Sequence, residues 1–151
     1  MHTTINYKKL KSNAKEPTRG SNKAAGYDLY ANIPKGEGYG VTIQPHTSQK
    51  IGTGLAIQPP ENTFGAIFPR SGLASKQGLR PSNCVGVCDE DYTGEYIISL
   101  HNDTNEVQIV SHGDRIAQLV FIPYTPVKFN EVDELTRTDR GDDGFGSTGV
   151  K

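Results

Sequence analysis

The segment Arg115-Ile-Ala-Gln-Leu-Val-Phe-Ile122 is a short run of β-branched, aliphatic and aromatic residues bounded by turn residues. A run of this length and composition predicts a β-strand. Five other short runs have the same character: residues 39–43, 54–58, 63–68, 95–100 and 107–110. The turns between them include Gln58-Pro-Pro-Glu-Asn62 and Asp91-Tyr-Thr-Gly94, and the second is expected to close a hairpin. Regular turn spacing of this kind predicts an all-β sandwich, jelly roll or barrel.

One short segment is predicted to be helical, Ser71-Gly-Leu-Ala-Ser-Lys-Gln-Gly78. Ser71 is its expected N-cap, and Gly78 is its expected C-terminal glycine. Residues 11–23 are polar and punctuated, which predicts a loop. The segment from Asp139 to Lys151 is glycine-rich without an apolar period. We therefore expect a β core over residues 1–138 and a flexible C-terminal arm over residues 139–151.

The size and charge of the chain limit its function. A length of 151 residues suits one domain with its own core. A net charge of -1 argues against a nucleic-acid or anionic-membrane partner. No membrane-length apolar run or secretory signal occurs, and Cys84 and Cys88 lie too close together for a disulfide framework. We expect a soluble intracellular protein of the cytoplasm or nucleus, with free thiols.

The arm contains Gly144-Phe-Gly-Ser-Thr-Gly149, which has the spacing of a dinucleotide-binding fingerprint. That interpretation fails because neither the preceding strand nor the following helix is present. Glycine backbone N–H groups and the hydroxyls of Ser147 and Thr148 nevertheless suit phosphate oxygens. Phe145 suits stacking on a base, and the alternative is a disordered tail.

Two further segments carry candidate chemistry. At Pro69-Arg-Ser-Gly-Leu-Ala74 a helix begins beside an arginine and a serine, which predicts an anion site; the alternative is a capped helix with a solvated arginine. Asp89, Glu90 and Asp91 follow an apolar strand. Asp89 and Asp91 would share one face, so one of them suits a general base; the alternative is an acidic turn. The spacing of the cysteines and histidines matches no zinc pattern, and no P-loop occurs.

Taken together, five segments resemble, in order and spacing, the five motifs of the trimeric deoxyuridine triphosphatases (dUTPases). They are residues 24–31, 69–74, 86–95, 113–120 and 140–149. The resemblance implies a jelly-roll-like β-barrel that hydrolyses dUTP to dUMP and pyrophosphate. It also implies a homotrimer with three active sites, each assembled from all three subunits, with the arm closing as a lid over a neighbouring site.

The resemblance assigns roles to individual residues. Asp89 would be the base for a water that attacks the α-phosphorus. Mg²⁺ would be the cofactor, chelated by the triphosphate and held through waters by Asp28. The resemblance places the phosphates and neighbouring parts of the substrate at two groups of residues: Arg70, Ser71, Gly72 and Gln118 in the core, and Arg140, Gly146, Ser147 and Thr148 in the arm.

Choice of base and sugar would fall to the hairpin from Asn83 to Ile97. Its main-chain groups, including those of Val87 and Cys88, would pair with the uracil edge, together with the Asn83 side chain. Tyr92 would lie beneath the sugar and reject a 2′-hydroxyl, and Phe145 would cover the uracil.

Departures from the family pattern and rival functions complete the expectations. Asp143 stands where a glycine is commoner, and residues 131–143 carry a net charge of -4, which repels a bare triphosphate. Cys88 replaces a commoner aliphatic residue. One rival is a dCTP deaminase of related fold, and another is a non-catalytic protein that binds dUTP and signals through a partner.

Overall fold

A computed structural model describes residues 4–34, 36 and 40–142. These residues form eleven strands and one helix, which confirms the all-β prediction. The elements are β1 (Tyr7–Lys9), β2 (Tyr27–Tyr30), β3 (Gly40–Ile43), β4 (Ser48–Gly52), β5 (Leu55–Ile57), β6 (Thr63–Phe68), α1 (Ser71–Gln77), β7 (Leu79–Pro81), β8 (Gly86–Cys88), β9 (Ile97–Asn102), β10 (Gln108–Ser111) and β11 (Arg115–Pro123).

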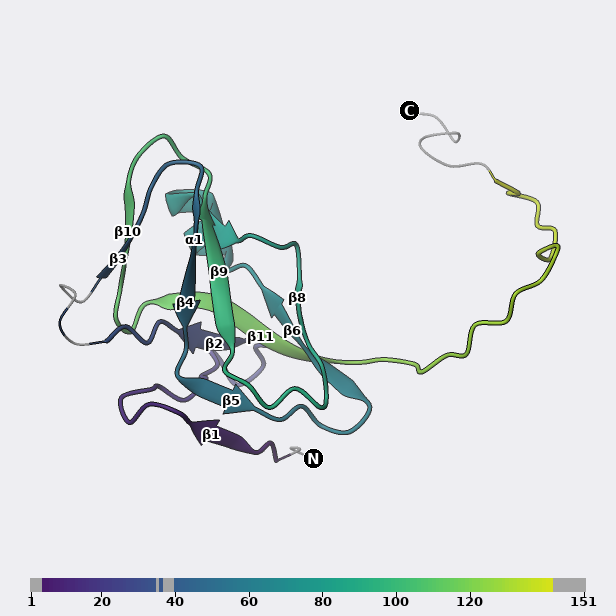
Figure 1. Ribbon diagram of the computed structural model, residues 1–151, viewed down its shortest axis with the longest axis horizontal. Helices are drawn as coiled ribbons and strands as arrows, with labels where there is room; N and C mark the ends of the chain where they lie inside the picture. The colour runs from purple at the N-terminus through teal and green to yellow at the C-terminus, as the bar shows by residue number, and fades with distance from the viewer. Residues whose placement is uncertain (1–3, 35, 37–39, 143–151) are drawn as a thin grey trace.

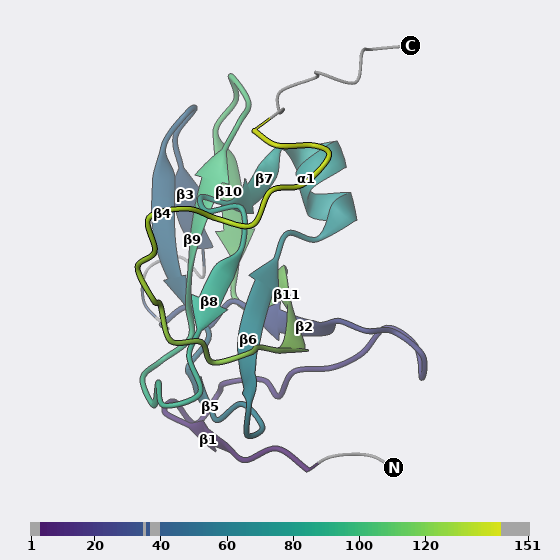
Figure 2. The ribbon, with the colours of Figure 1, turned by 90° about the vertical axis from the view of Figure 1, so that its right-hand side faces the viewer.

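The strands form four antiparallel sheets; Figure 1 labels all of their strands except β7, which is labelled in Figure 2. The largest has the order β2-β11-β6-β8, and the next has the order β4-β9-β7. The two-stranded sheets β1-β5 and β3-β10 extend the edges. The two larger sheets face each other, as Figure 2 shows, and among the described residues no backbone ladder closes them into a continuous barrel.

Strand β11 is central to the largest sheet because both of its edges are paired. It lies against β2 on one side, with Gln118 opposite Asp28, and against β6 on the other. A register irregularity between Arg115 and Ala117 marks a bulge, and the adjacent residues Ile116 and Ala117 are both buried. The bulge thus separates the exposed Arg115 from the regular alternation that follows it.

The second sheet supplies the other wall of the core. Along β9 the side chains alternate, so that Ile98, Leu100 and Asn102 are buried. Ile98 and Leu100 belong to one apolar cluster with Leu29 of β2 and Leu119 of β11. Burial of this period-two pattern holds the sheets together.

Asn102 is the most buried polar side chain, with no exposed area. Its amide nitrogen donates to the carbonyls of Ile43 and Glu106, and its carbonyl oxygen accepts from the backbone N–H and hydroxyl of Thr104. Both donors and both acceptor positions are therefore used. These bonds join the end of β9 to β3 and shape the turn before β10.

Helix α1 begins one residue earlier than the predicted cap implied. Ser71 is the first helical residue, and Arg70 is the N-cap in an extended conformation without a side-chain capping bond. The prediction of Ser71 as N-cap is therefore wrong. Gly78 ends the helix with φ of 63°, as predicted, and a Cβ there would collide with the side chain of Thr104.

The predicted hairpin at Asp91–Gly94 is also wrong as a strand pairing. β8 pairs with β6, whereas β9 pairs with β4 and β7. The intervening residues pass from one sheet to the other. Tyr96 fixes the crossing, because its backbone N–H donates to Leu55 and its carbonyl accepts from the backbone and hydroxyl of Thr53.

The chain leaves the β-sheets after Pro123. Residues 124–142, which lead into the predicted arm and are counted as part of it from here on, contain no strand or helix and run away from the body (Figure 1). The last strand ends at Pro123, before residue 138. The boundary between core and arm at residue 138 therefore stays a prediction. No helix in the described ranges is long and apolar enough to cross a membrane.

We predict that Asn102→Leu lowers the free energy of unfolding by about 2–4 kcal/mol, because it leaves buried carbonyls and a backbone N–H without a hydrogen-bond partner. Urea unfolding at fixed protein concentration measures the loss. The exposed Asn105→Ala is the control and should change it by less than about 0.5 kcal/mol. Similar values for the two variants would contradict the role of the buried amide.

Candidate active site

A buried carboxylate lies between two arginines at one end of the largest sheet. The side chain of Asp28 is 12% exposed; its Oδ1 accepts from Nε of Arg70 at 2.7 Å, and its Oδ2 accepts from Nη1 of Arg115 at 3.3 Å. Asp28 comes from β2, Arg70 from the start of α1 and Arg115 from the start of β11. The pair to Arg70 is the more buried, since Arg70 is 26% and Arg115 51% exposed.

Arg70 binds Asp28 through Nε alone, so its terminal nitrogens make no hydrogen bond to the other described residues. A guanidinium has five N–H donors in a fixed fork, and the terminal ones suit two oxygens of an anion. Asp28 thereby fixes the orientation of the Arg70 guanidinium.

The two arginines line a groove of about 320 Å³ with main-chain and small residues. Its other lining residues are Gly20, Ala24, Ala25, Gly26, Asp28, Ser71, Gly72 and Gln118. Gln118 is held by donating to the carbonyl of Pro69 at 2.9 Å. A Cβ at Gly26 would collide with the Gln118 side chain, so the close approach requires glycine. We call this surface the phosphate groove.

A second group of predicted residues lies beyond the end of β8. Asn83, Val87, Cys88, Asp89, Tyr92 and Ile97 line a pocket of about 240 Å³ together with Ile67, Gly86, Glu95 and Tyr96. Asp89 is exposed and its carbonyl accepts the backbone N–H of Tyr92, which closes a turn. Glu90 points elsewhere, accepting from the backbone of Asn62 and the hydroxyl of Tyr124. We call this group the acidic pocket.

The wall of the acidic pocket is fixed by tyrosines and a glutamate. The Tyr92 hydroxyl donates to the carbonyl of Glu95 at 2.9 Å, and a Cβ at Gly94 would collide with that hydroxyl. The Glu95 carboxylate accepts from the backbone N–H of Gly54 at 2.7 Å. These contacts hold the Tyr92 ring at the pocket edge, 6.2 Å from the ring centre of Tyr96.

Cys88 and Tyr96 form a buried pair behind Asp89. Burial raises the pKa of the Cys88 thiol, and the charge of Asp89 adds to the effect. Burial also raises the pKa of the Tyr96 hydroxyl, which lies beside that thiol and makes no hydrogen bond of ordinary geometry within the described ranges. Both groups stay neutral, so Cys88 contributes packing and its backbone to the pocket, as a small apolar residue would.

Asp89 and the phosphate groove lie at opposite ends of β6. The register places Cys88 opposite Gly65, so Asp89 lies beside the start of β6, whereas Arg70 follows its end. Six residues of extended chain separate Phe64 from Arg70, a distance of about 20 Å. One chain therefore does not bring Asp89 to the phosphate groove.

The remaining predicted residues belong to the C-terminal part. Arg140 belongs to the segment that runs away from the body after β11 (Figure 1), and Phe145, Gly146, Ser147, Thr148 and Asp143 lie outside the described residues. Sequence reasoning missed Arg115 and Glu90 as contributors. Arg115 lies in the motif segment 113–120, and its position before a buried run is the only signal for it in the sequence. Glu90 alternates with Asp89 and Asp91, so the sequence places it on the opposite face and predicts no partner for it.

The Asp28 carboxylate suits a cation that is held through its water ligands. Among the described residues no group of three or more His, Cys, Asp or Glu side chains could hold a metal. A carboxylate has about four lone-pair positions, and the arginines use two of those on Asp28. The others can accept from the water ligands of a Mg²⁺ that the phosphates carry, as this ion keeps several waters.

Comparisons with known proteins agree with this geometry. The sequence profile of the dUTPase family matches residues 12–149. A deoxyuridine 5'-triphosphate nucleotidohydrolase of Desulfitobacterium hafniense is 49% identical over 128 residues, covering 84% of this chain and 82% of that protein. A mutant dUTPase of Staphylococcus bacteriophage 80alpha, solved with dUpNHpp, has a TM-score of 0.86 at 29% identity, covering 99% and 100% of the two chains. The likeness confirms the predicted jelly-roll fold.

A second solved structure concerns a metal. It is a mutant dUTPase from phage phi11 of S. aureus, described as showing the coordination of a structural Mg(II) ion. Its TM-score is 0.75 at 25% identity, covering 87% of this chain and 98% of that chain.

We predict that Asp28→Asn lowers the free energy of unfolding by about 1–3 kcal/mol, because two guanidiniums lose their counter-charge in a mostly buried place. Arg115→Gln removes the half-exposed pair and should cost less than about 1 kcal/mol. Urea unfolding of both variants, at one protein concentration, measures the difference. Equal losses would show that burial of the carboxylate is not what matters.

Proposed function

This chain belongs to the dUTPase family, and from that premise we propose that it hydrolyses dUTP to dUMP and pyrophosphate at sites shared between subunits. Each site would combine the phosphate groove of one chain with the acidic pocket of another. The observation that carries the sharing is the register of β8 on β6, which separates Asp89 from Arg70 by about 20 Å in one chain. Because the phosphates of dUTP are covalently linked, no single chain offers both groups to one triphosphate.

The reaction needs one base and one water. Asp89 is exposed at the end of a short paired strand, so its carboxylate can accept a proton from a water in the pocket. The water oxygen attacks the α-phosphorus, and the bond from that phosphorus to the bridging oxygen breaks. Pyrophosphate then leaves with the electron pair of that bond, and the water's proton passes to Asp89.

The phosphate groove would hold the charged end of the substrate. Arg70, Ser71 and Gly72 line it, with Gln118 held beside them. Arg115 adds positive charge on the far side of Asp28. A Mg²⁺ bound to the phosphates would neutralise charge as pyrophosphate leaves, with Asp28 accepting from its waters.

The acidic pocket would select the base and sugar. Asn83 and the backbone of Val87 and Cys88 lie on one wall, suited to the hydrogen-bonding edge of uracil. Tyr92 is held by its hydroxyl bond to Glu95, so its ring cannot swing aside for a ribose 2′-hydroxyl. Rejection of UTP would then be steric.

The proposed assembly is a homotrimer in which the third subunit supplies the arm. Arg140, with Phe145, Gly146, Ser147 and Thr148, would cover the nucleotide and exclude water from the reacting phosphate. Because the substrate is a DNA precursor, the proposed site of action is inside the cell, in the cytoplasm or nucleus.

We predict that Asp89→Asn retains dUTP binding but lowers turnover by at least about 100-fold, since it removes the base and spares the phosphate contacts. Pyrophosphate release and equilibrium binding of a non-hydrolysable dUTP analogue measure the two effects. Asp91→Asn, an exposed carboxylate two residues away, is the matched control and should stay within a few-fold of the native rate.

The same assay with dUTP, dTTP, dCTP and UTP, with and without Mg²⁺, separates the rival functions. A dCTP deaminase would release ammonia from dCTP and no pyrophosphate. A non-catalytic sensor would bind dUTP without turnover. Equal rates with dUTP and UTP would contradict the role of Tyr92.

We predict that two inactive variants restore activity when their chains are mixed. Asp89→Asn chains keep the groove and Arg70→Gln chains keep the base, so refolding an equal mixture should give about one quarter of native activity if each site takes its two parts from neighbours. Refolding each variant alone is the control. Absence of recovery in mixtures shown to contain both chains would mean that each site belongs to one chain.

A further inference from the structure

Asp89 opens a four-residue turn at the end of β8. The backbone N–H of Tyr92 donates to the carbonyl of Asp89 at 3.1 Å, so Glu90 and Asp91 are the central residues of this turn. β8 has only three residues, and among the described strands it pairs only with β6. The carboxylate proposed as the base therefore stands on a short edge strand and a mostly exposed turn, where little backbone pairing fixes its direction.

Asp89 borders two open spaces. It lines the acidic pocket and, with Val87, it also lines a larger groove of about 750 Å³. The other lining residues of this groove, called the side groove here, are Gln58, Phe64, Glu90, Asp91 and Tyr124. A base must keep its carboxylate on the side where the nucleotide binds. The turn therefore needs a constraint that decides between the pocket and the side groove.

The side chain of Glu90 supplies such a constraint. Its Oε2 accepts two hydrogen bonds, from the backbone N–H of Asn62 at 2.9 Å and from the hydroxyl of Tyr124 at 3.0 Å. Within the described ranges, no other side chain of the turn forms a hydrogen bond outside residues 89–95. Hydrogen bonds to a carboxylate are roughly twice as strong as those between neutral groups. Glu90 thus ties the turn to two other segments of the chain.

The two partners of Glu90 are held to each other. Asn62 precedes β6 and has a φ of 58°, a left-handed conformation that asparagine tolerates. Its carbonyl accepts from the backbone N–H of Tyr124 at 3.2 Å. Tyr124 directly follows the pair of Pro123 with Thr63, which ends the ladder between β11 and β6. Three hydrogen bonds therefore join the turn, the start of β6 and the end of β11.

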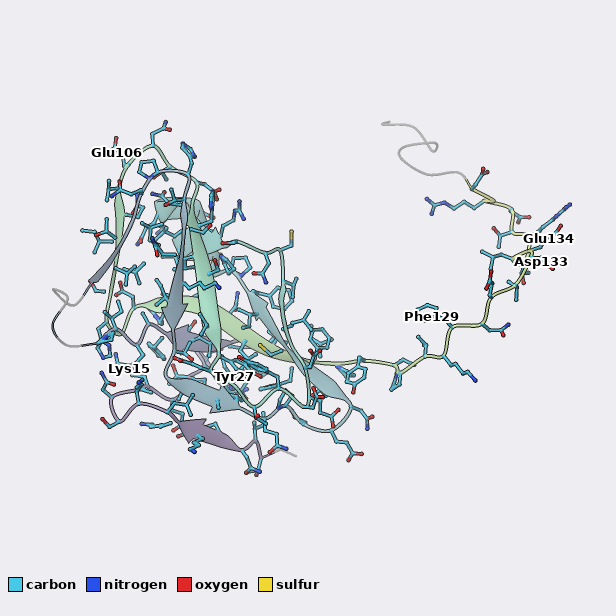
Figure 3. All side chains as sticks on the ribbon, in the orientation of Figure 1. Lys15, Tyr27, Glu106, Phe129, Asp133 and Glu134 are labelled. Atoms are coloured by element: carbon cyan, nitrogen blue, oxygen red, sulfur yellow. The ribbon has the colours of Figure 1, made fainter. Side chains whose placement is uncertain are left out.

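Tyr124 is also the first residue of the arm. Further along, the side chains of Phe129, Asp133 and Glu134 lie away from the body (Figure 3). The hydrogen bonds of Tyr124 hold the root of the arm next to the turn. The bond to Glu90 raises the pKa of the Tyr124 hydroxyl above its usual value, so the hydroxyl keeps its proton at neutral pH and continues to donate.

We propose that Glu90 and Tyr124 are positioning residues, which hold the turn so that the Asp89 carboxylate faces the acidic pocket and not the side groove. The proposal rests on the function proposed above and adds the residues that orient its base. Neither residue touches the nucleotide in this scheme, so their loss slows the chemical step without weakening dUTP binding. A base displaced by about 1 Å can lose about 100-fold in rate, and a turn that spends part of its time in the productive orientation loses less.

The first test separates the chemical step from binding. Tyr124→Phe should lower the single-turnover rate of pyrophosphate release by about fivefold, and Glu90→Ala by about tenfold or more, with affinity for a non-hydrolysable dUTP analogue within about twofold of native. Glu90→Gln keeps an oxygen acceptor and should stay within about threefold of the native rate. Tyr7→Phe is the matched control, because it removes a similar bond, 2.9 Å long, from a tyrosine that is 40% exposed against 42% for Tyr124.

The second test measures whether the two residues act together. Glu90→Ala combined with Tyr124→Phe should be no slower than Glu90→Ala alone, because the hydroxyl has already lost its acceptor. Rate losses that multiply in the combined variant would contradict the proposal. So would a native rate in both single variants, or a weaker affinity for the analogue in place of a slower chemical step.

Amide hydrogen exchange reports on the turn without any turnover. In Glu90→Ala the N–H of Tyr92, which donates to Asp89, should exchange at least about tenfold faster than in the native protein. The N–H of Tyr96, which donates to Leu55, is the internal control and should be unchanged. Unchanged exchange at Tyr92 would refute the role of Glu90. Because this readout needs no dUTP hydrolysis, failure of the proposed function and failure of the positioning role give different results.

Discussion

The carboxylate of Asp28 joins three parts of the chain that are distant in sequence. It accepts from Arg70 at the start of α1 and from Arg115 at the start of β11, and it stands on β2 between them. Burying a charge is costly unless it is paired and hydrogen-bonded, so Asp28 depends above all on its shorter and more buried pair with Arg70. In return the arginines are fixed in orientation, and Arg70 keeps its terminal nitrogens free for an anion.

The strands that the sequence predicted well are those in which most residues are apolar and buried or partly buried. β6 and β11 were placed within a residue, because their apolar residues match the core they form. β4 was missed because Ser48, Gln49 and Lys50 are exposed and only Ile51 is buried. A strand that contributes one side chain to the core carries almost no apolar period, and only its partner β9 reveals it.

The wrong predictions near the site have a common cause. The local sequence was compatible with two conformations, and tertiary contacts decided which of them forms. A turn at Asp91–Gly94 is compatible with a hairpin, but Tyr96 is tied to Thr53 and Leu55, so the chain crosses between sheets. Ser71 is a good N-cap residue, yet Arg70 occupies the cap because Asp28 holds its side chain. Arg115 could not be recognised as a site residue from the sequence, because what places it at the site is its hydrogen bond to Asp28, which is 87 residues away.

The small net charge hides the fact that positive and negative charges are concentrated in different parts of the chain. The overall value of -1 combines a strongly basic stretch before residue 24 with a strongly acidic one after residue 130. Such charges in one chain can attract between copies as readily as within one. A site divided between subunits, as proposed, requires that each subunit recognise its neighbour. If the motif residues bind the nucleotide, recognition between subunits falls mainly to other segments, and most of the opposite charges of this chain lie there.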